Sequence, residues 1–323
     1  MDSIHMLVII LGVLFAVALG YAILYSKQLR HLNPFMDKHL LERGMEKPVL
    51  WLFYNHSDTN QREWQDFGAR SSRALNIPFL NLCYESIVHH NKGEYRIEVI
   101  SGLSGVAEVL GGWDQLPPGF RQHGAISPIN EMELNWIRTA ILAKFGGLWL
   151  TPHTVCLKGF GVLPKDKTVF FGTDIDETFA GPQGTAVPGF RAVWSPVAHH
   201  PMFEEWAAVC YDRIVKKSGG DQIRGDVKHD FVRFSTEYVK TGIIVDPAAE
   251  GLRKKNGKRI QLEDLLSTGT DGNLPFDVTS YTVYIPFPWT ELRDREMFGW
   301  FLRMSEEQIM KSDIAVKYLL QHK

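Results

Sequence analysis

A helical pattern that ends at two glycines and continues at once as a short strand limits the folds open to this 323-residue chain more than any other stretch. Between Glu131 and Phe145, apolar residues recur at three- and four-residue spacing, which predicts a helix with one buried face. Gly146 and Gly147 stop this helix, because glycine takes a left-handed cap conformation without steric cost. The continuous apolar run 148–150 then predicts a strand buried on both faces. A ligand would meet the polar residues that follow this strand.

A second apolar run, from Val49 to Tyr54, predicts another central strand, and the polar loop after it starts at Asn55. In nucleotide-binding α/β domains, the ligand lies beyond the carboxyl ends of such strands. The sequence therefore predicts an α/β domain over residues 48–323, with a mostly parallel sheet flanked by helices. Its cleft would lie at the carboxyl ends of the strands that begin at Val49 and Leu148. Further strands are expected at 95–99, 168–171, 192–195 and 281–286.

The run 131–160 resembles the sugar-nucleotide-dependent glycosyltransferases of the capsular-polysaccharide-synthesis and mannosyltransferase-like group. That family has a helix of the form Ser-Asp-x-x-Arg, followed by Tyr-Gly-Gly-x-Trp-Leu-Asp-x-Asp. The resemblance covers roughly residues 48–320 and implies a GT-A fold, a nucleotide-sugar donor and a glycan or glycolipid acceptor. If active, the protein would be a hexosyltransferase-type enzyme. The residues that match the motif are Arg138, Gly146, Gly147, Trp149 and Leu150.

This chain departs from the family at the residues that specify its chemistry. In the family, the Asp-x-Asp ends the strand and holds a divalent metal ion that bridges the two phosphates of the donor. Thr151, Pro152 and His153 stand in its place, and Asn135 replaces the helix aspartate. The first strand and loop of the family contact the nucleotide base and ribose, although a simple strand-to-loop turn is the alternative here. The resemblance implies donor-binding roles for Tyr54, Asn55, Asn135, Arg138, Gly147, Trp149 and Thr151.

Two places in the sequence offer ligands to a Mn²⁺ or Mg²⁺ ion. His153 supplies one imidazole, which Mn²⁺ accepts. Asp174 and Asp176 form an Asp-x-Asp after a later strand, and hard divalent cations prefer such oxygen ligands. The alternative for these two aspartates is a solvated acidic loop. Arg138 could supply positive charge instead, or could pair with Glu133 or Asp176. No residue is assigned as catalytic.

Residues 6–25 form an uncharged apolar stretch, long enough to cross a hydrocarbon core of about 30 Å. This stretch predicts a single-pass N-terminal transmembrane anchor within residues 1–30, followed by a connector at 31–47. A cleaved signal peptide is the alternative, but no Lys or Arg precedes the apolar stretch. Lys27 and Arg30 follow the span, so the positive-inside rule places the large domain in the cytosol. A lumenal type II arrangement would oppose this charge bias.

Composition narrows the classes of partner and function. A hydrophobic fraction of 45% and a net charge of −2 suit a globular domain and suggest no nucleic-acid partner. Cys83, Cys156 and Cys210 are too few for a disulfide framework and are expected to be buried thiols. Two functions remain open. One is a membrane-anchored glycosyltransferase with an altered or metal-independent donor site. The other is an inactive transferase fold that serves as a structural or assembly component of a membrane complex or virion.

Overall fold

The structure is a computed structural model, and its described residues from Pro48 onward belong to one unit. Within the described ranges, no helix is both long and apolar enough to cross a membrane. The predicted anchor and most of the predicted connector lie outside those ranges. The structure describes residues 47–55, 78–122, 129–173, 188–218, 230, 233–234, 242–251, 254, 259–269, 273–276 and 278–321.

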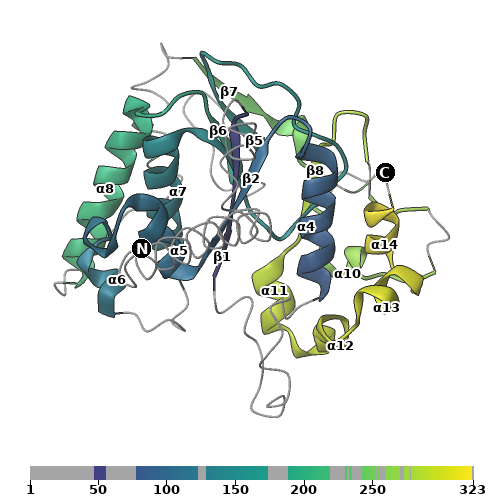
Figure 1. The fold of residues 1–323 in the computed structure, drawn as a ribbon. Helices are drawn as coiled ribbons and strands as arrows, with labels where there is room; N and C mark the ends of the chain where they lie inside the picture. Colours follow the sequence, from purple (N-terminus) through teal and green to yellow (C-terminus); the bar gives the residue numbers. More distant parts are fainter. Residues whose placement is uncertain are drawn as a thin grey trace, which may run out of the picture. The chain divides into compact units, whose positions relative to one another are not determined.

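A six-stranded sheet forms the centre of this unit (Figure 1). Its strand order is β2-β1-β3-β6-β5-β7, and five of the six strands run in one direction while β6 runs against them. The predicted α/β class with a mostly parallel sheet is therefore confirmed. The six strands are β1 (Val49–Tyr54), β2 (Arg96–Ser101), β3 (Gly147–Leu150), β5 (Thr168–Thr173), β6 (Pro188–Ser195) and β7 (Ile243–Asp246). A separate antiparallel pair joins β4 (Thr154–Cys156) to β8 (Tyr284–Pro286).

Helices cover both faces of the sheet, and Figure 1 shows them in two groups on either side of it. Strand β1 faces both groups, since Trp51 and Phe53 belong to one core and Leu50, Leu52 and Tyr54 to the other. This explains its uninterrupted apolar run. The first group is α5 (Gly102–Leu110), α6 (Pro118–Gln122), α7 (Glu131–Phe145) and α8 (Pro201–Ser218). The second is α4 (Pro78–Asn91), α10 (Leu262–Leu265), α11 (Trp289–Asp294), α12 (Gly299–Leu302), α13 (Glu306–Lys311) and α14 (Ala315–Leu320).

The junction between α7 and β3 follows the sequence pattern, with one difference. Asn130 and Glu133 begin α7 with a capping box, in which each side chain accepts from the other residue's backbone N–H. Gly146 ends the helix with φ 66° but ψ −159°, so the predicted left-handed helical cap is wrong and the chain turns directly into the strand. Gly147 has φ +95°, and a Cβ there would lie 2.5 Å from the carbonyl oxygen of Val49. The missing side chain is what lets β3 lie against β1.

The three cysteines are buried free thiols, as predicted. Burial raises the pKa of Cys156 and of Cys210 to about 12, with smaller effects from neighbouring groups. Burial also raises the pKa of Cys83. All three thiols therefore stay protonated at neutral pH, and we assign them to packing rather than to nucleophilic chemistry.

Candidate functional site

The strand order indicates a candidate ligand site on this sheet. From β1 the chain passes through α4 to β2 on one side, and then through α5, α6 and α7 to β3 on the other side of β1. Helix α4 packs on one face, whereas α5 to α7 pack on the opposite face. Such a reversal is a topological switch point, and open α/β sheets bind ligands beyond the carboxyl ends of the strands there. Leu52 pairs with Leu150, so Tyr54 and Thr151 leave the sheet at neighbouring strand ends.

The tripeptide after β3 is packed against β6 and α11. The backbone N–H of Thr151 donates to the carbonyl oxygen of Arg191 at 2.8 Å, and the Thr151 hydroxyl donates to the same oxygen at 3.2 Å. Pro152 is buried. The imidazole of His153 lies parallel to the indole of Trp289, with ring centroids 4.7 Å apart and an interplanar angle of 5°. The tripeptide therefore links the end of β3 to two other elements.

The donors after β3 do not fit a hard divalent cation. His153 is partly exposed, but its Nε2 is buried, and burial together with the positive charge of Arg293 lowers its pKa to about 3. One neutral imidazole and one hydroxyl are a poor substitute for the several oxygens that Mn²⁺ or Mg²⁺ requires. Within the described residues, no group of three or more His, Cys, Asp or Glu side chains could hold a metal ion. Asp174 and Asp176 lie outside those residues, so their metal site stays a prediction.

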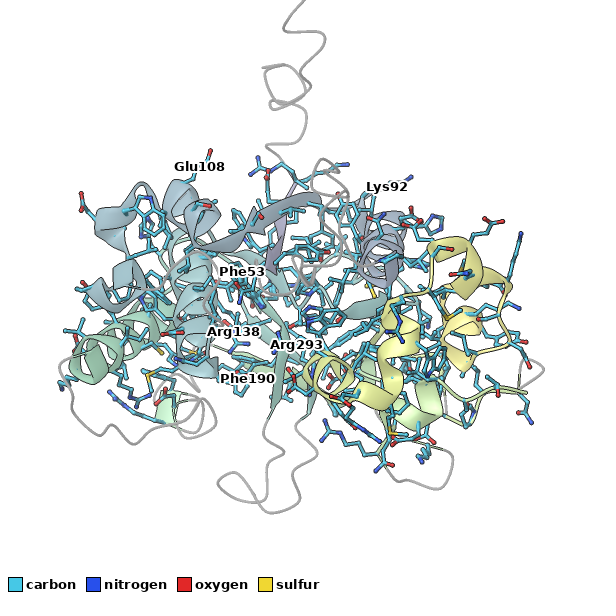
Figure 2. The ribbon with its side chains drawn as sticks, turned by 90° about the horizontal axis from the view of Figure 1, so that it is seen from below. Phe53, Lys92, Glu108, Arg138, Phe190 and Arg293 are labelled. Carbon is cyan, nitrogen blue, oxygen red and sulfur yellow. The ribbon has the colours of Figure 1, made fainter. Side chains whose placement is uncertain are left out.

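Asn135 and Arg138 form a buried pair on α7, next to Phe190 of β6. Arg138 is 5% exposed, its Nη2 donates to Oδ1 of Asn135 at 2.7 Å, and its Nη1 donates to the carbonyl oxygen of Phe190. The guanidinium also lies 5.3 Å from the centroid of the Phe190 ring, and Figure 2 labels the two residues next to each other. Burial lowers the pKa of Arg138 to about 10, so the side chain stays charged at neutral pH. Glu133, one predicted partner of Arg138, takes part in the capping box of α7.

We expect Arg138→Met to lower the free energy of unfolding by roughly 2–3 kcal/mol, because it leaves two buried acceptors without their donor. The acceptors are the carbonyl oxygen of Phe190 and the side-chain oxygen of Asn135. The double variant with Asn135→Leu removes one of these acceptors and should recover part of the loss. Urea denaturation measures both variants. A loss below about 0.5 kcal/mol for Arg138→Met would show that these hydrogen bonds contribute no net stability.

Gly147 and Trp149 are fixed by packing within the sheet. Gly147 stands at the amino end of β3, next to Val49 and at the far end of the strand from Thr151. Trp149 is 2% exposed, and its ring stacks on Phe53 with centroids 6.3 Å apart. Packing alone accounts for both residues, so their part in the motif indicates architecture. The donor-binding role that the resemblance implies for them stays a prediction.

Tyr54 and Asn55 stand at the carboxyl end of β1. Tyr54 is 2% exposed, and its hydroxyl is buried with no hydrogen-bond partner among the described residues. Burial raises the pKa of this hydroxyl far above its ordinary value, with smaller effects from Cys83 and Tyr84. A buried hydroxyl without a partner costs about 1–3 kcal/mol, so a polar group that reached it would gain that amount. Asn55 is partly exposed at the same strand end.

The sequence analysis missed an ion pair at this edge of the sheet. Arg191 on β6 donates from Nη1 to Oε1 of Glu250 at 3.0 Å, and Glu250 follows the short helix η6 (Pro247–Ala249). The Glu250 side chain has 0% exposure, whereas that of Arg191 is 31% exposed. Burial raises the pKa of Glu250 to about 7, although Arg191 acts in the opposite direction. The apolar run 243–245 could have predicted the strand β7, and with it the position of Glu250 beyond the end of that strand.

Comparison with known proteins adds only distant similarities. No protein-family model and no curated protein matches this chain. The solved structure of PaToxG glycosyltransferase is 11% identical over 60% of this chain and 71% of that chain, with a TM-score of 0.36. The apo-form glycosyltransferase GlyE of Streptococcus pneumoniae TIGR4 is 10% identical over 81% of this chain and 61% of that chain, with a TM-score of 0.35. Similarity at this level carries no assignment of activity. What the fold and site define is a mixed α/β protein with its candidate site at a switch point.

Proposed function

We propose that this protein is a glycosyltransferase that binds a nucleotide sugar at the switch point between β1 and β3 and transfers the sugar to a glycan or glycolipid. One observation carries the proposal. The strand ends at Tyr54 and Thr151 adjoin each other at a switch point, and hydrogen bonds tie β6 to Thr151 and to Arg138 of α7. This is where an α/β sheet of this kind binds nucleotides. The sequence motif supports the choice of a sugar nucleotide.

Glycosyl transfer places specific demands on such a site. The bond between the anomeric carbon and the diphosphate breaks, a bond to an acceptor hydroxyl forms, and that hydroxyl loses its proton. The negative charge that develops on the leaving diphosphate must be stabilised. The residues after β3 do not fit a divalent ion, but two partly exposed arginines adjoin them. The carbonyl oxygen of Arg191 accepts hydrogen bonds from Thr151. The positive charge of Arg293, together with the larger effect of burial, lowers the pKa of His153. We propose that positive side chains provide the stabilisation.

The absence of carboxylates after β3 favours a second function. Thr151 and His153 are engaged in contacts with β6 and α11, which are contacts that a structural role would require as much as a catalytic one. An inactive glycosyltransferase fold could serve as an assembly component of a membrane complex or a virion. In either case we propose that residues 6–25 anchor the domain to a membrane, with the domain in the cytosol or, alternatively, in the lumen.

A thermal-shift titration of the full-length protein in detergent tests the proposed function. The probes are uridine, guanosine, cytidine and adenosine diphosphates and their sugar conjugates, each with Mn²⁺ and with EDTA. We expect one nucleotide class to raise the melting temperature, because a ligand at a hundred times its dissociation constant stabilises a protein by about 2.7 kcal/mol. Release of that nucleoside diphosphate from the matching sugar conjugate then measures activity. Flat curves across the panel, with a cooperative melt, would favour the assembly component.

A further inference from the structure

We propose that Arg191 binds the diphosphate of the donor, and that Glu250 positions the guanidinium of Arg191. This inference rests on the proposed function and assigns the anion-binding part of the same site. The ligand is defined by its chemistry as a diphosphate group, either free or as part of a nucleotide.

The backbone of Arg191 is fixed next to the end of β3. Its carbonyl oxygen accepts from both the N–H and the hydroxyl of Thr151. The carbonyl oxygen of the preceding residue, Phe190, accepts from the buried Arg138. Two consecutive residues of β6 are therefore tied to β3 and to α7. The Arg191 side chain starts from a rigid point at the switch point, which lowers the entropy cost of holding a ligand there.

The side chain of Arg191 is partly enclosed and partly open to solvent. Its Nη1 is held at 3.0 Å by Oε1 of Glu250, a carboxylate with no exposed surface, while Arg191 itself is 31% exposed. A guanidinium carries five N–H donors in a planar fork and pairs well with phosphate oxygens. An anion that arrives from solvent can thus reach a guanidinium whose orientation is already set from the buried side.

Glu250 is positioned by contacts that extend well below the surface. A Cβ on Gly172 of β5 would lie 2.1 Å from Oε2 of Glu250, so this oxygen sits directly against the β5 backbone. Tyr284 of β8 donates its hydroxyl to the carbonyl oxygen of Phe171 at 2.8 Å, next to the same carboxylate. The charged and titratable groups that act on Glu250 are Arg191, Tyr284 and Arg259. Glu250 is therefore a positioning residue, because it has no exposed surface through which to contact a ligand.

A second arginine, Arg293, lies near the tripeptide. Burial and then the positive charge of Arg293 on α11 lower the pKa of His153. The Arg293 side chain is 27% exposed, and its Nε lies 3.5 Å from Oδ1 of the exposed Asp294. The backbone of Arg191 thus adjoins Thr151, and Arg293 lies close enough to His153 to affect its imidazole. Two arginines at this edge of the sheet would attract a diphosphate without help from a metal ion.

Calorimetric titration of the full-length protein tests the inference, with inorganic pyrophosphate and the four nucleoside diphosphates as probes, in EDTA. We expect Arg191→Gln to raise the dissociation constant about 10- to 100-fold, as for loss of one charge-assisted contact. Arg233→Gln is the matched control, because it removes an exposed arginine that also pairs with a glutamate, and it should change affinity less than about two-fold. Arg191→Lys keeps the charge and loses the fork, so it should bind with intermediate affinity and decides the question if Arg191→Gln does not fold.

Glu250→Gln has a signature that a merely structural residue would not give. In the wild type, ionised Glu250 offsets the charge of Arg191, and Gln cannot do so. The ratio of wild-type to variant affinity for pyrophosphate should therefore fall as pH rises from about 6 to 8. A constant ratio would overturn the role of Glu250. Unchanged affinity in Arg191→Gln would overturn the inference and leave the proposed function standing. A wild type that binds no diphosphate would overturn both.

Discussion

Replacing Gly147 by alanine is expected to lower the free energy of unfolding by roughly 3–5 kcal/mol, the combined effect of backbone strain and steric overlap. Gly147 has φ +95°, a conformation that alanine rarely adopts. The added Cβ would lie 2.5 Å from the carbonyl oxygen of Val49 and 3.1 Å from Nε1 of Trp51. Neither atom can retreat easily, because Val49 belongs to β1 and the Trp51 indole donates to the carbonyl oxygen of Gly146 at 2.9 Å.

Gly161→Ala separates the two parts of this effect. Gly161 also has a positive φ, +68°, but nothing lies within 4 Å of the place its Cβ would take. Its replacement should therefore cost only about 1–2 kcal/mol, the strain of the left-handed conformation. Chemical denaturation of both variants gives the comparison. Equal losses in the two would mean that the close approach of β3 to β1 does not require a glycine.

The second large effect is on the pH dependence of stability. The pKa of His153 is lowered in the folded protein, whereas the pKa of Glu250 is raised. The pKa of His153 is lowered from 6.5 to about 3, so its contribution to stability is present above pH 6.5 and is lost as pH falls towards 3. The pKa of Glu250 is raised from 4.5 to about 7, so its contribution is present below pH 4.5 and is lost as pH rises towards 7. The full effects are of order 5 kcal/mol for His153 and 3 kcal/mol for Glu250. Between pH 4.5 and 6.5 their slopes cancel.

Single variants should reveal the two opposed slopes. His153→Phe keeps a flat ring against Trp289 and removes the titration, so its stability should fall more steeply than the wild type as pH rises from 4.5 to 6.5. Glu250→Gln keeps an acceptor for Arg191, and its stability should rise over the same window. Urea denaturation at several pH values measures both slopes. Two variants with parallel pH profiles would show that these groups do not control the pH dependence.

Much of the fold could be predicted because the sequence of each strand or helix by itself shows which residues are buried. The run from Val49 to Tyr54 is the whole of β1, and the pattern from Glu131 to Phe145 is the whole of α7. The uninterrupted apolar run reports burial on both faces of β1, and the helical spacing of apolar residues reports the buried face of α7. The neighbouring positions of Tyr54 and Thr151 also followed, because parallel strands bring their carboxyl ends to one edge.

The chemistry at that edge could not be predicted, because it depends on pairings between distant segments. Nothing local in the run around Ala192 indicates that β6 runs against its neighbours. That reversal brings the amino end of β6, with Phe190 and Arg191, to the carboxyl edge. It also explains why Arg138, which matches the family motif, is held by a backbone carbonyl in the protein interior. The Arg191–Glu250 pair joins residues 59 positions apart, so sequence spacing gave no sign of it.

The pairing of β4 with β8 has a consequence for biosynthesis. Strand β4 follows the tripeptide directly, yet its partner strand comes some 130 residues later, and Trp289, which stacks on His153, comes later still. Helices α13 and α14 then close over α4. A growing chain can form β1, β2 and β3 early on the ribosome, but the surroundings of the tripeptide cannot be completed until residues 284–320 have emerged. Nascent chains of this protein would therefore carry an unfinished site during about the second half of their synthesis.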